Sequence, residues 1–220
     1  MSLEVIEFES APNPTASIII LHGLGADGND FVPIAQELDL ASVGPVRFVF
    51  PSAPTRPVTI NGGYLMRAWY DILGTEVARR EDEAGLRASQ ALIEALIANE
   101  RARGIAANRI VLAGFSQGCA MTFMAGLRHG ERLAGLLGMS GYLPLADLTA
   151  TERSAANAGV PIFQAHGSAD PMITMARATA SRDALIALGY PVEWHAYPMP
   201  HSVCPPEVVD MNRWLLRVLA

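Results

Sequence analysis

One serine in this sequence lies where its hydroxyl could act as a nucleophile. Ser116 stands at the centre of Gly114-Phe115-Ser116-Gln117-Gly118, after the apolar run Ile110 to Ala113 and before a helical pattern over Gln117 to Leu127. A strand that turns sharply into a helix exposes the residue at the turn, and the small residues on either side let the strand and the helix pass closely. The turn also places Ser116 at a helix N-terminus, where free N–H groups stabilise a developing oxyanion.

A serine hydroxyl becomes a useful nucleophile only when a base takes its proton, so a carboxylate and a histidine should follow Ser116 in the chain. Asp170 comes after the predicted strand Pro161 to Ala165, and His201 comes after the predicted strand Val192 to Tyr197. Both residues are therefore expected at the carboxyl edge of the sheet, as Ser116 is. They complete the order serine, acid, histidine.

Other acids and histidines compete for these two roles. Asp147 lies in a loop after another predicted strand and is the main rival of Asp170, whereas Asp183 falls within a helical pattern and is expected on a solvated face. Asp170 has an alternative role as a turn or helix cap before Pro171, which aspartate favours. The remaining histidines adjoin a glycine loop, close a helix, end a strand or lie within one, and they are expected to be structural. They are His22, His129, His166 and His195.

The glycine-rich segment from Gly23 to Gly28 fits G-x-G-x-x-G directly after a predicted strand, which raises the question of a dinucleotide site. Such a site needs an acid about 20 residues later to hold the ribose. The next predicted strand, Val46 to Phe50, ends in a proline-rich segment and offers no such acid. The loop fits better as a source of the second oxyanion donor, near Leu24, with the N–H of Gln117 as the first.

Short apolar runs alternate with longer helical patterns along the chain. The expected strands are Ser17 to Leu21, Val46 to Phe50, Ile110 to Ala113, Ala134 to Met139, Pro161 to Ala165 and Val192 to Tyr197, with Val5 to Phe8 as an antiparallel edge. The expected helices are Phe31 to Leu38, Leu86 to Arg103, Gln117 to Leu127, Met175 to Leu188 and Pro206 to Leu219. Strands that are apolar nearly throughout are covered on both faces, so the pattern predicts an α/β fold with a mostly parallel, doubly wound sheet of about seven strands and helices on both faces.

The length predicts a single domain over residues 1–220, with one segment that departs from the regular pattern. At about 55–83 the sequence combines prolines and a glycine pair with the exposed-looking aromatics Tyr64, Trp69 and Tyr70. Long irregular segments in compact domains often form lids or binding loops, so we expect a substrate-side loop or flap here. The alternative is an ordinary surface excursion.

The composition argues against several classes of protein. The net charge is −6, and no block of Lys or Arg offers a surface for nucleic acid or anionic lipid. The N-terminus carries acids where a secretory signal carries basic residues, and no apolar run approaches the roughly 20 residues of a spanning helix. Two cysteines, Cys119 and Cys204, lack metal-ligand spacing and fit free thiols. We therefore expect a cytoplasmic protein without stable membrane insertion or a structural metal, and no oligomeric state is indicated.

Four segments together carry a resemblance to a known family. They are His22-Gly23-Leu24-Gly25-Ala26-Asp27, Gly114-Phe115-Ser116-Gln117-Gly118, His166-Gly167-Ser168-Ala169-Asp170 and Met199-Pro200-His201. From about Pro14 onward the chain resembles the carboxylesterases and acyl-protein thioesterases of the phospholipase/carboxylesterase group of α/β-hydrolases. Pro51 to Gly63 and Trp69 to Ile72 are similar to the segment that precedes and forms the substrate-side loop in bacterial members.

The resemblance implies Ser116, Asp170 and His201 as the catalytic triad and the backbone N–H groups of Leu24 and Gln117 as the oxyanion hole. It implies a flap that meets the acyl chain, and no cofactor. The residues on the substrate side of that flap are Trp69, Ile72, Leu73 and Val77. Two positions depart from many relatives, which have glycine there: Cys119 adds volume beneath the turn, and Pro200 stiffens the loop that carries the base.

The expected activity is hydrolysis of acyl esters through an acyl-Ser116 intermediate, with short- to medium-chain carboxylic esters as the first choice of small-molecule substrate. The alternative within the same chemistry is an acyl-protein thioesterase or a lysophospholipase, acting on long acyl chains of an acylated protein or a lysophospholipid. An alternative of another class is a catalytically silent scaffold that binds a small ligand or a protein. The intact set of Ser116, Asp170 and His201 argues against the silent scaffold.

Overall fold

The chain alternates strands and helices around one large sheet. The computed structural model describes residues 3–74 and 81–220. The strands are β1 (Glu4–Glu9), β2 (Ala16–Leu21), β3 (Val46–Ser52), β4 (Thr55–Val58), β5 (Tyr64–Arg67), β6 (Ile110–Phe115), β7 (Gly135–Met139), β8 (Ile162–Gly167) and β9 (Val192–Tyr197). The α-helices are α1 (Val32–Gln36), α2 (Glu83–Ala102), α3 (Gln117–Gly126), α4 (Ala146–Glu152), α5 (Met175–Ala187) and α6 (Pro205–Val218).

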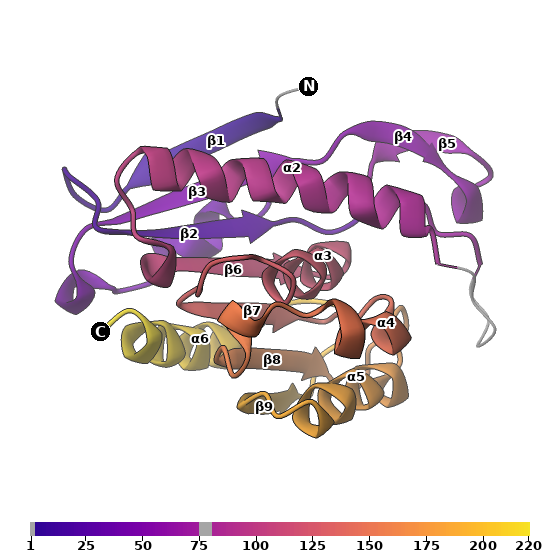
Figure 1. The fold of residues 1–220 in the computed structure, drawn as a ribbon. Coiled ribbons are helices and arrows are strands. Elements are labelled where there is room, and N and C mark those ends of the chain that lie inside the picture. Colours follow the sequence, from indigo (N-terminus) through magenta and orange to yellow (C-terminus); the bar gives the residue numbers. More distant parts are fainter. Residues whose placement is uncertain (1–2, 75–80) are drawn as a thin grey trace.

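The large sheet has seven strands in the order β1-β3-β2-β6-β7-β8-β9 (Figure 1). β1 pairs antiparallel with β3, and every other pair in this sheet is parallel. The mostly parallel α/β sheet with one antiparallel edge is therefore confirmed. After β3 the chain returns past β2 to form β6, so the direction of winding reverses between β2 and β6. The carboxyl ends of strands beside such a reversal leave a crevice where ligands bind.

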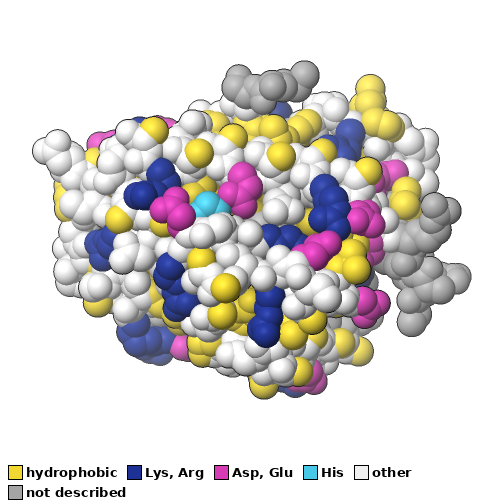
Figure 2. All heavy atoms as spheres, in the orientation of Figure 1, with side chains coloured by type: hydrophobic (Ala, Val, Ile, Leu, Met, Phe, Trp, Pro, Cys, Tyr) yellow, Lys and Arg dark blue, Asp and Glu magenta, His cyan; other side chains and the backbone are white. Residues whose placement is uncertain are grey.

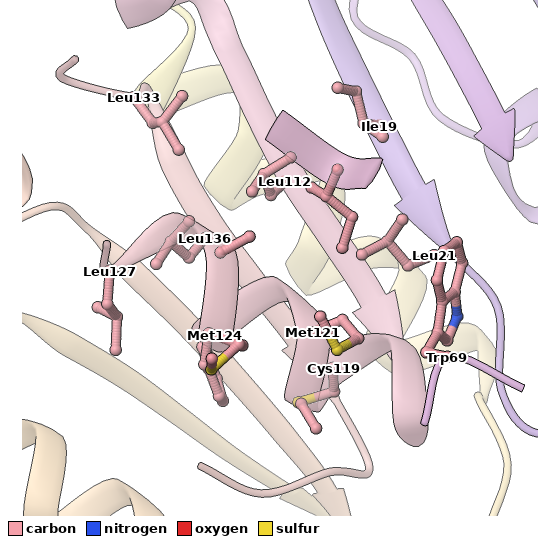
Figure 3. Packing of buried hydrophobic residues seen from close by; sticks show 14 of the residues in the cluster. Ile19, Leu21, Trp69, Leu112, Cys119, Met121, Met124, Leu127, Leu133 and Leu136 are labelled. Carbon is pink, nitrogen blue, oxygen red and sulfur yellow. The ribbon is translucent and has the colours of Figure 1, made fainter. Parts of the chain in front are cut away.

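The side chains of successive residues in the central strands point alternately into two apolar layers, one on each face of the sheet. Ile19 of β2 packs with residues of α2 and α3, whereas its neighbour Ile20 packs with residues of α1 and α6. Figure 1 shows α2 crossing in front of the sheet and α6 behind it. In the first layer, Leu112 of β6 belongs to the same buried cluster as Met121 and Met124 of α3 (Figure 3). Because both faces are covered, the strands are apolar nearly throughout, as parallel strands commonly are.

The segment at about 55–83, which we expected to be irregular, contains a hairpin. β4 and β5 pair antiparallel, with Thr55 opposite Arg67 and Val58 opposite Tyr64, in a two-stranded sheet separate from the large one. Tyr64 is 69% exposed, as its surroundings predict. Trp69 and Tyr70 are 0% and 4% exposed, so the expectation of exposed aromatics is wrong for these two residues.

Basic and acidic side chains both lie on the face that α2 crosses (Figure 2). Figure 2 shows basic side chains beside acidic ones, and every basic side chain is arginine because the sequence contains no lysine. On α2, Arg101 lies 3.0 Å from Glu131 and Arg87 lies 2.7 Å from Glu152. This face therefore presents no extended positive surface. Across residues 3–74 and 81–220, no helix is both long and apolar enough to cross a bilayer.

Candidate active site

Ser116 occupies the turn between β6 and α3 in a strained backbone conformation. Its φ of 57° and ψ of −115° are rarely adopted by residues with a side chain, and such strain costs on the order of 1–3 kcal/mol. The Ser116 N–H donates to the carbonyl of Met139 (2.9 Å), and the Ser116 carbonyl accepts from the N–H of Ala120 (3.2 Å). A Cβ at Gly118 would lie 1.9 Å from the carbonyl oxygen of Leu21, so this turn closes only over glycine.

His201 is hydrogen-bonded to the acid that the chain order predicts. The Nδ1 atom of His201 lies 2.7 Å from Oδ2 of Asp170, whose side chain is 0% exposed. The two rival acids do not reach this histidine: Asp147 is exposed on α4, and Asp183 is exposed on α5, where it pairs with the neighbouring Arg182. Of these three acids, Asp170 is therefore the one that is bonded to His201.

The second oxygen of Asp170 is held by the backbone. Oδ1 accepts from the N–H groups of Met172 (2.8 Å) and Ile173 (2.9 Å). Burial acts to raise the pKa of Asp170, but the hydrogen bonds from His201, Ile173 and Met172 outweigh it and lower the pKa below its ordinary value of 3.8. The carboxylate is therefore ionised at neutral pH. The predicted turn role of Asp170 is also present, since these two bonds turn the chain before α5, whereas the helix itself is capped by Thr174.

The loops that carry Asp170 and His201 are joined to each other by their backbones. The Ser168 N–H donates to the carbonyl of Tyr197 (2.7 Å), and the Ala169 N–H donates to the carbonyl of Met199 (3.1 Å). A Cβ at Gly167 would lie 2.4 Å from the carbonyl oxygen of Met199, so glycine permits this close approach. These bonds fix the position of the acid relative to the base.

The base also lies against the nucleophile turn. The His201 ring packs on Phe115, the residue before Ser116, with ring centroids 4.7 Å apart. Because Nδ1 is hydrogen-bonded to the ionised Asp170, the proton belongs on Nδ1 and leaves Nε2 as the acceptor. The arrangement is suited to removing a proton from the serine hydroxyl.

The two predicted oxyanion donors are backbone N–H groups that follow β2 and β6, the strands between which the direction of winding reverses. Among the residues that the structure describes, neither the Leu24 N–H nor the Gln117 N–H donates to a protein acceptor. Leu24 follows β2, and Gln117 begins α3 after β6. Two neighbouring N–H groups without acceptors suit the oxyanion of a tetrahedral intermediate.

His22 holds the Leu24 loop in place. Its Nδ1 atom lies 2.6 Å from the carbonyl oxygen of Gly23, and its Nε2 atom accepts from the N–H of Ala53 (2.9 Å). The ring therefore carries its proton on Nδ1 and joins the ends of β2 and β3. Burial is the main cause that lowers the pKa of His22 below its ordinary value of 6.5, so the ring stays neutral.

The side chain of Gln117 ties the segment before the flap to the nucleophile turn. Its Oε1 atom accepts from the Trp69 N–H (3.1 Å), and its Nε2 atom donates to the carbonyl of Tyr70 (2.9 Å). The indole N–H of Trp69 donates in turn to the carbonyl of His22 (2.9 Å). Residues 69 and 70 thus connect the segments that carry the two predicted oxyanion donors. Sequence reasoning missed this role of Gln117, for which the one signal is a polar side chain at the start of an apolar helix.

Trp69 was expected to contact the substrate, and the structure places it in the core instead. The indole is 0% exposed and lies beside Leu21 (Figure 3). Its backbone carbonyl also accepts from the hydroxyl of Ser89 on α2. We therefore assign Trp69 to the support of the loop that carries Leu24 and do not retain it as a substrate contact.

The other predicted substrate-side residues lie at a hollow next to the nucleophile turn. Ile72 and Leu73 line it together with Tyr70 and Tyr142, and Leu73 is 43% exposed. The hydroxyls of Tyr70 and Tyr142 lie 2.7 Å apart. Tyr142 follows the carboxyl end of β7, as the Ser116 turn follows that of β6, so the hollow belongs to the same edge of the sheet. Val77, the remaining predicted flap residue, lies outside the described residues.

Cys119 fills the space beneath the nucleophile turn. A Cβ at Gly141 would lie 2.4 Å from the Cβ of Cys119, and one at Gly138 would lie 2.7 Å from its Sγ. Small residues at these two positions accommodate the extra volume. Burial raises the pKa of the Cys119 thiol, so it carries no thiolate.

Features outside this edge do not rival it as a site of chemistry. A cavity of about 750 Å³ lies at the opposite edge of the sheet, lined by residues such as Asn108, Pro161 and Val192 at the amino ends of β6, β8 and β9. In the described part of the chain, no three His, Cys, Asp or Glu side chains come together in a group that could hold a metal ion. His166 is fully buried behind the site, with Nε2 2.8 Å from the carbonyl oxygen of Ile173 and 3.5 Å from Oδ2 of Asp170.

Known proteins resemble this chain over almost its whole length. The model of the family described as phospholipase/carboxylesterase matches residues 2–219. Acyl-protein thioesterase 1 of Yarrowia lipolytica is 39% identical, with 91% of each chain aligned, and acyl-protein thioesterase 1 of Mycosarcoma maydis is 40% identical, with 98% of this chain and 96% of the relative aligned. The crystal structure of acyl-protein thioesterase 2 from Zea mays covers 99% of both chains at 27% identity and a TM-score of 0.88.

Proposed function

Since the chain belongs to the phospholipase/carboxylesterase family of α/β-hydrolases, we propose that it is a serine thioesterase that removes long acyl groups from S-acylated proteins. The observation that carries the chemistry is the hydrogen bond between Asp170 and His201 beside the strained Ser116 turn. The choice of substrate is supported by the relatives named acyl-protein thioesterase 1, which align over nine-tenths or more of this chain. These relatives favour a long-chain thioester over the short-chain ester that the sequence alone placed first.

In the proposed reaction, the Ser116 hydroxyl attacks the acyl carbon while His201 Nε2 takes its proton. Asp170 keeps the ring in this orientation and stabilises the imidazolium that forms. The N–H groups of Leu24 and Gln117 stabilise the negative oxygen of the tetrahedral intermediate. The bond to the cysteine sulfur then breaks and leaves an acyl-serine.

The second half of the reaction transfers the acyl group to water. His201 gives its proton to the departing thiolate, then takes one from a water molecule that attacks the acyl-Ser116 ester. Collapse of the second tetrahedral intermediate frees the carboxylic acid and restores the serine hydroxyl. Ile72 and Leu73 at the hollow are the described residues that we propose to contact the acyl chain.

Two matched series of peptides test the substrate. One series carries acetyl, octanoyl or palmitoyl on the same cysteine, and the other carries the same groups on serine as oxygen esters. We expect kcat/KM on the cysteine peptides to rise at least tenfold from acetyl to palmitoyl, below the concentration at which the peptides aggregate. Ser116→Ala serves as the blank. A rate that is highest for acetyl serine and falls with chain length would overturn the thioesterase proposal in favour of a short-chain esterase.

A further inference from the structure

The loop that carries His201 is anchored at two ends, and the two anchors are built differently. Its first end follows β9, where the carbonyls of Tyr197 and Met199 accept from the N–H groups of Ser168 and Ala169. These bonds join it to the Asp170 loop. Its second end is Cys204, the residue from which α6 begins. The position of His201 therefore depends on how the start of α6 is held as well as on β9.

A single acid lies buried at that second anchor. Glu207 stands three residues after Cys204, and it is 0% exposed. An acid at this position commonly reaches back to the N–H of the residue that caps the helix. The Cys204 N–H does act on the Glu207 carboxyl, but neither carboxyl oxygen has a partner with hydrogen-bond geometry among the described residues. The Cys204 side chain makes no capping bond either.

The sequence of the first turn explains why this acid lacks donors. A helix N-terminus ordinarily stabilises a carboxylate through its free N–H groups. Here the two residues between Cys204 and Glu207 are Pro205 and Pro206, which have no N–H. The first turn of the helix therefore lacks two N–H groups that would otherwise donate hydrogen bonds to a carboxylate.

Among the described residues, no basic group pairs with Glu207, and the nearby Asp210 is the acid that His195 (3.5 Å) and Arg213 approach. The hydroxyl of Tyr197, from β9, and the carboxylate of Asp210, from α6, are hydrogen-bonded to each other (2.9 Å). Burial, then Asp210 and Glu207, raise the pKa of that hydroxyl. None of the described arginines forms an ion pair with Glu207, and Arg213, one turn further along α6, pairs with Asp210 (2.8 Å). Burial accordingly raises the pKa of Glu207 from 4.5 to about 8.

We infer that Glu207 is a positioning residue for His201: its carboxyl stays buried at the start of α6 while it is neutral, and its ionisation loosens the loop that carries the base. A carboxylate formed in this buried position can gain donors only by drawing in water, because the described residues supply none besides the Cys204 N–H. The displacement passes to Cys204 and along the short loop to His201. This inference rests on the proposed function, since it assigns Glu207 a part in the same reaction.

The test is the pH dependence of kcat on the octanoyl cysteine peptide, with the Ser116→Ala blank subtracted at each pH. The protonated fraction of an acid with a pKa of about 8 falls about tenfold between pH 7 and pH 9. We therefore expect kcat at pH 9 to be about one-tenth of its value at pH 7 in the wild type. In Glu207→Gln, which is neutral at both pH values, and in the apolar Glu207→Met, the ratio should be near 1.

A matched control is Glu37→Gln, which removes an exposed carboxylate far from this loop in the chain and should retain the wild-type ratio. Circular dichroism at both pH values separates loss of folding from loss of activity. A tenfold fall that persists unchanged in folded Glu207→Gln or Glu207→Met would overturn the inference. A wild type that hydrolyses none of the peptides at pH 7 would instead overturn the proposed function.

If neither Glu207 variant folds, the wild type itself provides the test. Difference infrared spectra between pH 7 and pH 9 should lose one protonated-carboxyl band with the midpoint at which kcat falls. A spectrum without such a band, which would mean that every carboxyl is already ionised at pH 7, would contradict the inference.

Discussion

Gly118 makes one of the tightest contacts of the nucleophile turn, and replacing it with alanine should damage the site in a predictable way. The added methyl carbon would lie 1.9 Å from the carbonyl oxygen of Leu21 and 2.8 Å from that of His22. Carbon–oxygen contacts of this kind are essentially never shorter than 3.0 Å, so the Gly118→Ala backbone must separate from Leu21 by at least 1.1 Å (3.0 − 1.9). Leu21 ends β2, which is paired on both sides by β3 and β6 and cannot yield as a surface loop does.

The displacement therefore falls on the start of α3 and on the loop after β2, which carry the two proposed oxyanion donors. Overpacking of this kind costs about 1–3 kcal/mol of the free energy of unfolding. A misplacement of about 1 Å in a catalytic constellation can cost about 100-fold in rate. We expect Gly118→Ala to lose about 100-fold in kcat/KM on the octanoyl cysteine peptide and about 1–3 kcal/mol in chemical denaturation.

Gly130→Ala is the matched control. This exposed glycine has open space around its Cα, so the same substitution should change the free energy of unfolding by no more than about 0.5 kcal/mol and leave kcat/KM intact. A Gly118→Ala protein with wild-type kcat/KM and wild-type stability would refute the account of this turn.

Three further outcomes are expected. Gln117→Leu should lower the free energy of unfolding by about 2–6 kcal/mol in chemical denaturation, because it leaves the buried Trp69 N–H and Tyr70 carbonyl without partners at about 1–3 kcal/mol each; a change below 0.5 kcal/mol would contradict this. A thiol reagent should modify one cysteine in the native protein and two in denaturant, since Cys119 is fully buried and Cys204 is not; rapid native modification of both would show that Cys119 is accessible. Because the pKa of Glu207 is raised from 4.5 to about 8, its contribution to stability is full below pH 4.5 and is lost as the pH rises to 8. Chemical denaturation should therefore show that the free energy of unfolding of the wild type falls by up to about 5 kcal/mol relative to that of Glu207→Gln between pH 4.5 and 9. A constant difference between the two free energies over this range would contradict the raised pKa of Glu207.

The large sheet and the acid of the site could be predicted because both leave local signals. A strand covered on both faces must be apolar nearly throughout, and β2, β6 and β8 are recognisable for that reason. The choice of Asp170 over Asp147 followed from its position after a strand with His201 still to come, and the hydrogen bond to His201 agrees with it.

The short elements left no comparable signal. α4 has seven residues, starts from Leu145 in a left-handed conformation and has no side-chain cap, so neither periodicity nor a capping residue marks it. β4 and β5 have four residues each, and Pro57 interrupts the first. Strands this short carry too few alternations to be distinguished from a loop.

The misjudged position of Trp69 has a different cause. Its burial depends on partners that are distant in the chain: His22, 47 residues before it, and Gln117, 48 residues after it. A proline- and glycine-rich neighbourhood predicts exposure, and only the tertiary structure reveals that this indole is buried in the core and bonded to the loop after β2. The two hydrogen bonds from the Gln117 side chain to residues 69 and 70 could not be predicted from the sequence for the same reason.

The most direct test of the central claim is covalent labelling by a fluorophosphonate, followed by intact mass. A serine activated by a base loses its proton to His201 and attacks the phosphorus, whereas an ordinary serine does not react. The account predicts one label per chain, located on Ser116 and absent from Ser116→Ala, with much slower labelling in Asp170→Asn. An unlabelled wild type, or a Ser116→Ala protein that is labelled as fast as the wild type, would contradict it.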